Sequence, residues 1–174
     1  MNLTDILPVE QWIELEKEIH ARSGLNPSIY DADGVNITGT VTRNPLCHAI
    51  KNNSEGQALI CSPSHQNITH EAKKSFKPVI GVCHSGQTKI VVPIYVGVTF
   101  VGAAGGCGLI PEGSGVDGLF VSKTLGIGNK RLEDLTKDIP SISQKKAQDV
   151  ARYIKERIDG IISIYMLLQY KGDK

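Results

Sequence analysis

Hydrophobic residues near the start of the chain recur at helical spacing. Leu7, Trp12, Leu15 and Ile19 lie three to five residues apart among charged neighbours. This spacing predicts an amphipathic helix that ends near the Ser23-Gly24 pair, because glycine commonly follows the last helical residue. We expect its apolar face to pack against a sheet.

Runs of β-branched and aromatic residues predict five strands. The first two, Ser28 to Tyr30 and Val35 to Thr38, flank an Asp-Gly turn that is a strong hairpin signal. The other three are residues 78–83, 89–96 and 100–104. Pro93 predicts an edge position or a bulge in the fourth strand, since proline cannot donate a hydrogen bond to the ladder.

The fifth predicted strand runs into the sequence Gly-Gly-Cys-Gly at residues 105–108. Glycines permit positive φ angles and let another group approach the backbone closely. We therefore expect a loop at this point, with Gly106 in contact with a ligand.

The remaining segments are predicted to be helical. Residues 44–76 are polar and helical, with breaks near 54–56 and at Ser62-Pro63. Two shorter helices follow, at 116–125 and 130–137.

The longest predicted helix covers about residues 143–170, with Ser143 as its N-cap. Its apolar positions repeat at spacings of four, four, three, four and three, at Val150, Ile154, Ile158, Ile161, Tyr165 and Leu168. Residues 161–168 are apolar on more than one side, so a monomer would expose some of them. We expect a homodimer through this helix.

The order of elements predicts an α+β fold. It consists of an antiparallel five-stranded sheet covered by helices, similar to PAS or GAF sensory domains, with a long C-terminal helix. No internal repeat or linker divides the 174 residues. We expect a single domain over residues 1–174.

Composition narrows the class of protein. Hydrophobic residues at 40% and charged residues at 21% are ordinary globular values. Nineteen basic and eighteen acidic residues give a net charge of +1 without a basic stripe, so we expect no nucleic-acid partner. The N-terminus lacks a secretory signal, and the most apolar stretch is far shorter than the roughly 20 residues that cross a bilayer. We expect a cytoplasmic protein without a membrane span.

Four cysteines are the most distinctive chemical groups. Cys47, Cys61, Cys83 and Cys107 are separated by thirteen, twenty-one and twenty-three residues, so no C-x-x-C motif is present. Cys83 is predicted to end one strand and Cys107 to lie at the end of another. If both ends share one edge of the sheet, Cys47 and Cys61 could cover them as a lid.

Three interpretations of the cysteines stay open. Each can be a small buried apolar residue. They can instead form a thiolate site for zinc or iron, or a site in which a thiolate or imidazole ligates haem. They can also be redox-reactive, near His84 or Lys89, with a reversible disulfide between Cys83 and Cys107.

Catalytic signatures are not found in the sequence. It contains no G-x-S-x-G nucleophile elbow, no phosphate-binding loop and no H-E-x-x-H motif, so we do not expect an enzyme. Asp31 and Asp33 are expected to form a turn. His65 and His70 lie in a polar helix and are expected to be solvated.

An ordered set of motifs resembles PocR sensory domains. It comprises IYDADG, LCHAIK around Cys47, IC at Cys61, VCHSG around Cys83, VVPIYV and FVGAAGGCGL, and it continues through VSKTLGI and DIPSIS. The resemblance implies a divergent PAS-like fold that recognises small molecules, such as simple hydrocarbon derivatives, in bacterial and archaeal signalling. It also implies that Cys47, Cys61, Cys83, His84 and Cys107 line the pocket or bind its cofactor.

The leading functional hypothesis is a sensor in which a small ligand or thiolate-held cofactor shifts the long C-terminal helix. No helix-turn-helix follows the resemblance, which favours a stand-alone sensor or a module that binds a downstream signalling protein. The alternatives are a thiol-based redox sensor and a protein-interaction module with a structural metal.

Overall fold

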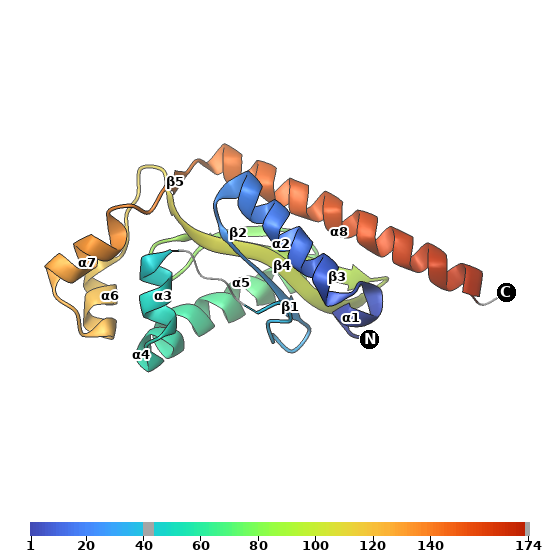
Figure 1. Ribbon diagram of the computed structural model, residues 1–174, viewed down its shortest axis with the longest axis horizontal. Coiled ribbons are helices and arrows are strands. Elements are labelled where there is room, and N and C mark those ends of the chain that lie inside the picture. Colours follow the sequence, from blue (N-terminus) through green and yellow to red (C-terminus); the bar gives the residue numbers. More distant parts are fainter. Residues whose placement is uncertain (40–43, 173–174) are drawn as a thin grey trace.

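A four-stranded antiparallel sheet forms the centre of the protein in a computed structural model, which describes residues 1–39 and 44–172 (Figure 1). Its order is β1-β4-β3-β2, with bounds β1 (Asn26–Asp31), β2 (Val79–Val82), β3 (Thr88–Val96) and β4 (Thr99–Pro111). A two-residue strand, β5 (Ser141–Ile142), pairs in parallel with the end of β4. The predicted α+β fold is confirmed.

Helices cover both faces of this sheet (Figure 1). One face carries α1 (Leu3–Ile6), α2 (Val9–Ser23) and α8 (Gln144–Gly172). The other face carries α3 (Pro45–Lys51), α4 (Ser54–Gly56), the π-helical segment η1 (Gln57–Cys61) and α5 (Ser62–Ser75). At one end of the molecule α6 (Gly118–Leu125) and α7 (Asn129–Thr136) pack against α3 and α4.

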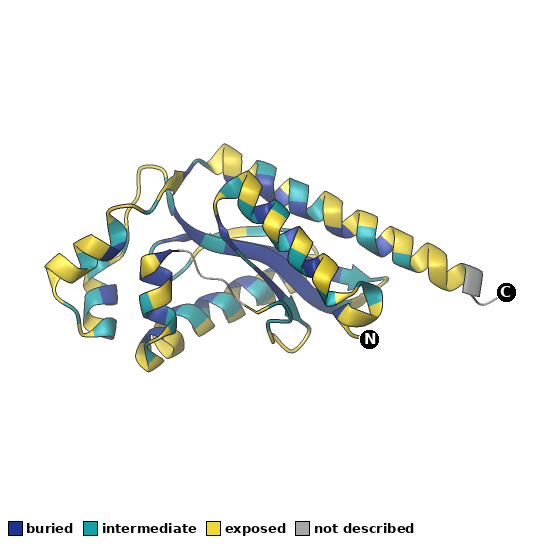
Figure 2. Ribbon diagram, in the orientation of Figure 1, coloured by how far each residue is buried: buried dark blue, intermediate teal, exposed yellow. Residues whose placement is uncertain are grey.

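Strand β3 divides its side chains between the two helical layers. Ile90, Val92 and Ile94 join the main core beneath α2 and α8, whereas Val91 packs against α5. Because successive side chains of a strand point to opposite faces, Lys89 lies on the α5 face with Val91. Figure 2 shows the central strands buried between the two layers.

The N-terminal and C-terminal helices end and begin where the sequence predicts, although Leu7 lies before α2, which starts at Val9. Gly24 caps α2 in the left-handed conformation at φ 75°, and the Ser143 hydroxyl accepts a hydrogen bond from Lys146 N at 3.1 Å at the start of α8. No helix within the described ranges is long and apolar enough to cross a membrane.

The chain turns after Tyr30 as predicted, but the predicted second strand at residues 35–38 is wrong. Residues 35–37 meet β1 through one isolated antiparallel bridge between Tyr30 and Asn36. Two backbone hydrogen bonds flank the bridge, from Asp31 N to the Val35 carbonyl at 2.9 Å and from Ile37 N to the Ile29 carbonyl at 3.1 Å. The Asn36 side chain accepts hydrogen bonds from the backbone N–H groups of Thr38 and Gly39, and such local bonds compete with a strand ladder. The full-length partner of β1 is β4.

The predicted glycine loop at 105–108 is also wrong, because β4 continues through it to Pro111. Strand β4 has neighbours on both sides, and a Cβ at Gly105 would lie 1.9 Å from the Ile90 carbonyl oxygen. Glycine therefore permits close strand packing here rather than a loop. As a result Cys107 lies inside the sheet and not at a strand end.

Two prolines behave differently from each other. Pro93 lies beyond residues 88–91, the part of β3 that pairs with β2, and a register shift follows it at Ile94/Tyr95, as the predicted edge position or bulge requires. Pro63 does not break the chain, because it occupies the first turn of α5, where proline is tolerated. The predicted break at Ser62-Pro63 is replaced by the π-helical segment η1 before it.

Gly108→Ala should destabilise the protein more than Gly97→Ala. Both glycines have positive φ, but a Cβ at Gly108 would lie 2.5 Å from the Asn26 side-chain nitrogen, whereas one at Gly97 meets nothing within 4 Å. We expect Gly97→Ala to lower the free energy of unfolding by about 1 kcal/mol and Gly108→Ala by about 2–4 kcal/mol. Urea unfolding of both variants measures the difference, and equal losses would contradict the contact.

Candidate functional site

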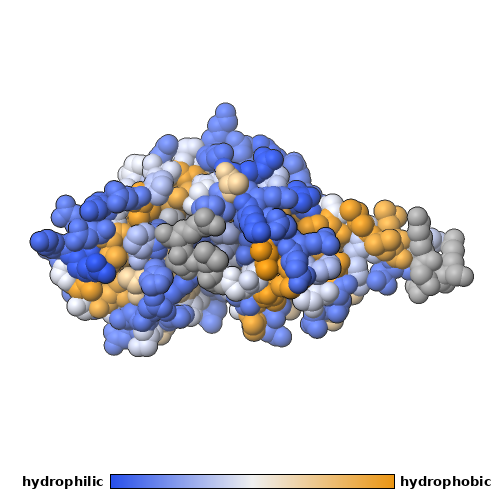
Figure 3. Space-filling model, in the orientation of Figure 1, coloured by the Kyte–Doolittle hydropathy of each residue, from blue (hydrophilic) through white to orange (hydrophobic). Residues whose placement is uncertain are grey.

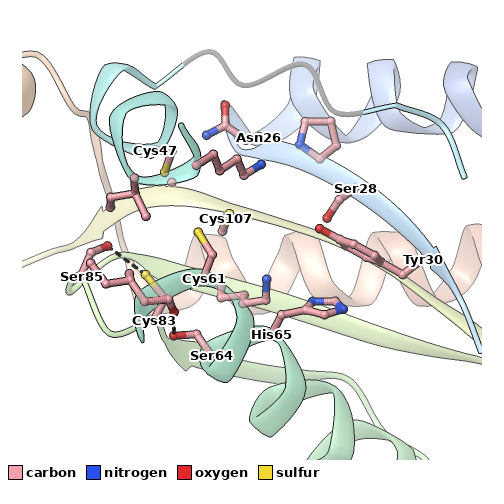
Figure 4. Close-up of a pocket in the computed structure, with 16 residues that line it drawn as sticks. Asn26, Ser28, Tyr30, Cys47, Cys61, Ser64, His65, Cys83, Ser85 and Cys107 are labelled. Carbon is pink, nitrogen blue, oxygen red and sulfur yellow. Dashed lines mark hydrogen bonds between the residues drawn. The ribbon is translucent and has the colours of Figure 1, made fainter. Parts of the chain in front are cut away.

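A cavity of about 60 Å³ lies between the sheet and the layer formed by α3, η1 and α5 (Figure 4). It is bordered by a surface groove of about 390 Å³, and both are lined by Tyr30, Lys51, Cys61 and His65. The cavity therefore has a side that faces the solvent, next to the turn after β1.

Three adjacent strands form the floor of the cavity. Asn26 of β1, Cys107 of β4 and Lys89 of β3 are partners across the sheet, and all three line the cavity. Further along β4, the residues that point to the same face as Cys107 are Gly105 and Ala103. Because these residues are small, they leave space above the sheet. Helices α3 and α5 cover this space.

The four cysteines reach the cavity from four different segments. Cys47 comes from α3, Cys61 from η1, Cys83 from the turn after β2 and Cys107 from β4, and each of them lines the cavity. Figure 4 shows their side chains around the same space. All four are free thiols.

Two other predicted contacts lie outside the cavity lining. His84 is exposed, and its Nδ1 lies 3.1 Å from the Leu59 carbonyl oxygen. Gly106 belongs to the opposite face of β4, where a Cβ would lie 3.0 Å from Leu25 Cβ. The reason is strand alternation: since β4 is a continuous strand, Cys107 and Gly106 point in opposite directions.

A buried polar network fastens α3 to the sheet. The Asn44 side-chain nitrogen donates to Gln87 Oε1 at 2.6 Å and to the Gly108 carbonyl at 2.7 Å. Its oxygen caps α3 by accepting from the N–H groups of Leu46 and Cys47. Gln87, which has no exposed surface, also donates to the Ser85 hydroxyl at 2.9 Å and to Cys47 Sγ at 3.4 Å. This network holds Cys47 over Cys107.

The Cys47 and Cys107 thiols form an electrostatically linked pair. A hydrogen bond from Cys47, aided by the positive charges of Lys89 and Lys51, lowers the pKa of Cys107 although burial opposes the shift. The same bond raises the pKa of Cys47. Burial raises the pKa of Cys61, which keeps that thiol protonated. The pair therefore favours ionisation of Cys107 over ionisation of Cys47, next to the buried Lys89.

His65 is part of the cavity, contrary to the prediction that it is solvated. Its ring packs against Tyr30 in a tilted arrangement, with 4.0 Å between ring centroids and 40° between ring planes (Figure 4). Burial, together with the charge of Lys89, lowers the pKa of His65 to about 4, so the imidazole is neutral at pH 7. Its Nδ1 is buried and has no hydrogen-bond partner within the described residues.

Lys89 is the other important residue that sequence patterns did not assign to a cavity. Its side chain is only 8% exposed, and no carboxylate within residues 1–39 and 44–172 forms an ion pair with it. From the sequence it stands out as a lysine that opens a buried apolar strand and as a possible neighbour of a reactive cysteine. The register with Cys107 that gives it a role comes from tertiary pairing.

The metal prediction is not supported by the arrangement of side chains. The described residues include no group of three or more His, Cys, Asp or Glu side chains that could hold a metal ion. Cys47 and Cys107 are instead engaged with each other, and Cys83 Sγ lies 3.0 Å from the Ser85 hydroxyl.

Comparison with known proteins gives one match. A protein-family model described as a sensory domain found in PocR matches residues 5–166. No curated protein and no solved structure gave a significant match. The matched range includes every element from α2 to β5, all residues that line the cavity and most of α8.

The Cys107 thiolate should depend on Cys47. In Cys47→Ala the donor to Cys107 is lost, so the pKa of Cys107 should rise and thiolate absorbance in the ultraviolet at neutral pH should fall. Cys61→Ala is the matched control, because burial keeps Cys61 protonated. Titration of the absorbance against pH measures both variants. An unchanged signal in Cys47→Ala, or an equal loss in both, would rule out the hydrogen-bonded pair.

Proposed function

The chain belongs to the PocR sensory-domain family, and from this membership we propose that it binds a small organic molecule in the cavity between its sheet and α3–α5 and signals that binding through α8. The observation that carries the proposal is the cavity itself, which is partly enclosed, lies within the matched family range and is bordered by a solvent-facing groove. The proposal assigns binding, and no catalysed reaction, to this site.

The size of the cavity limits the ligand. At about 10–15 Å³ for each water-sized group, 60 Å³ holds about four to six non-hydrogen atoms. Ile50 and Ile60 supply an apolar wall, while Ser28, Tyr30, His65 and Lys89 supply polar groups. A few placed polar groups on an apolar surface are typical of small-molecule sites. A hydrocarbon chain of two to four carbons with one polar end fits both surfaces.

Strand β3 provides a route from the cavity to α8. Lys89 lines the cavity, and the next residue along the strand, Ile90, belongs to the core that contains Ile154 and Ile158 of α8. A ligand that moves β3 therefore changes the surface on which α8 packs. Such coupling requires that the ligand bind the two positions of β3 with different affinity.

The exposed end of α8 is the proposed output surface. Ile164, Leu167 and Leu168 follow one another at helical i, i+3, i+4 spacing, and each is more than 60% exposed. Figure 3 shows hydrophobic residues on the part of α8 that extends beyond the body of the protein. We propose that a second copy of the chain covers this stripe, and that a downstream signalling protein responds to the resulting helix pair.

A second candidate function uses the cysteines. All four line one cavity, which favours a reversible disulfide, formed when a sensed oxidant accepts two electrons from a pair of thiols. The hydrogen-bonded pair is Cys47 and Cys107, so a disulfide between these two replaces the Cys83–Cys107 pairing expected from the sequence. Thiol titration before and after treatment with a mild oxidant distinguishes this case from an organic ligand, and an unchanged thiol content would contradict it.

Filling the cavity should abolish ligand binding. Cys61→Phe places an aromatic ring at the boundary of the cavity and the groove, whereas Leu59→Phe, two residues earlier, changes a side chain that is 48% exposed. Thermal-shift screening with alcohols, diols, aldehydes, amides and acids of four to six non-hydrogen atoms should give a stabilising ligand for the wild type and Leu59→Phe only. Equal stabilisation of Cys61→Phe would place the ligand elsewhere, and no stabilisation of any form would contradict the proposal.

A charge on the α8 stripe should dissociate the dimer. Ile161 is a poor position for this test, because it packs against the main core. Ile164→Glu changes an exposed residue that is 62% accessible, and Ser163→Glu adds the same charge at the neighbouring exposed position. Light scattering should give a monomer for Ile164→Glu and a dimer for Ser163→Glu. A wild-type monomer, or a dimer unaffected by Ile164→Glu, would refute the stripe as the interface.

A further inference from the structure

Lys89 is a buried cation in a cavity without carboxylates. Its side chain is 92% buried, as its 8% exposure shows, and it lines both the cavity and the small adjoining hollow above Gly105 and Ala103. No Asp or Glu lines either space. Within residues 1–39 and 44–172, no carboxylate is ion-paired with it.

Burying an ammonium group without an opposite charge is costly, so an unpaired lysine is rarely retained at such a site. The surrounding residues reinforce the positive charge: Lys51 lines the same cavity, and both lysines act electrostatically on Cys107 and Cys61. A site with this charge favours an anion over a neutral molecule of equal size.

Neutral donors accompany the lysine. The buried Nδ1 of His65 has no hydrogen-bond partner among the described residues, and the hydroxyl-bearing residues Ser28 and Tyr30 line the cavity beside it (Figure 4). One cation and neutral donors match the two oxygens of a carboxylate, which accepts several hydrogen bonds and carries one negative charge.

We propose that the cavity binds a short-chain monocarboxylate, with Lys89 as the counter-charge of the carboxylate and the wall formed by Ile50 and Ile60 against its hydrocarbon part. The room for about four to six non-hydrogen atoms corresponds to acids of two to four carbons. This assignment rests on the proposed sensory function and specifies its ligand class.

The Cys107 thiol has a defined place in this arrangement. Cys107 is the cross-strand partner of Lys89, and the charge of Lys89 contributes to the lowered pKa of Cys107. A carboxylate bound beside Lys89 would offset this positive charge, so ligand binding should raise the pKa of Cys107.

Isothermal titration with propionate and with propionamide, in a buffer free of carboxylates, tests the assignment. The two molecules have the same number of non-hydrogen atoms and differ in charge. Propionate should bind the wild type at least about tenfold more tightly, because hydrogen bonds to a charged group are the stronger kind. Lys89→Met keeps the length of the side chain without its charge and should remove this preference. Lys74→Met, at an exposed position of α5, should keep it.

The outcomes separate the ligand class from the sensory function. Propionamide that binds as tightly as propionate overturns the carboxylate assignment and leaves small-molecule binding intact. Propionate binding that survives in a folded Lys89→Met protein also overturns it. If neither compound binds while an alcohol or diol of the same size binds in the cavity, the carboxylate assignment is also overturned. Failure of every compound contradicts the proposed function as well.

Discussion

The hydrogen bonds of the buried Asn44 side chain are the interaction on which the candidate site depends. One amide group caps α3, reaches Gln87 in the turn between β2 and β3, and meets the Gly108 carbonyl of β4. It thereby joins α3 to two segments that lie 43 and 64 residues from Asn44 in the sequence. A buried donor or acceptor that loses its partner lowers the free energy of unfolding by roughly 1–3 kcal/mol. The position of α3 above the sheet, and with it the roof of the cavity, follows from this network.

The two faces of β3 have separate tasks. The face with Ile90, Val92 and Ile94 is apolar and packs beneath α8, which is what a stable core requires. The face with Lys89 borders a hollow. This hollow exists because the neighbouring residues of β4, Gly105 and Ala103, are small. A charged residue at a buried strand position opposes stability, and departures of this kind are expected at functional sites. A displacement of β3 caused by a ligand at the Lys89 face therefore also displaces the apolar side chains that pack beneath α8.

The sequence predicted those elements whose signals are local. Periodicity and capping identified α2 and α8 with their ends, since Gly24 and Ser143 act within one turn of their helices. It failed where tertiary pairing decided the outcome. The glycines at 105–108 are typical of a loop, yet they allow β4 to lie between β1 and β3. The Asp-Gly turn is typical of a hairpin, yet β1 found its partner in β4.

The same distinction holds for the site. Each of the four cysteines predicted from the sequence lines the cavity, because the motifs around them mark real positions in the fold. Lys89, His65 and Gln87 were not assigned to it, since their roles depend on a register and on helix packing that no local pattern encodes. Amide chemical-shift mapping with a stabilising ligand tests the central claim most directly. We expect shifts concentrated at Lys89, Cys107, Cys61 and His65, with smaller ones along α8. Shifts confined to α2 or the loops, with the cavity residues unchanged, would contradict ligand binding in the cavity.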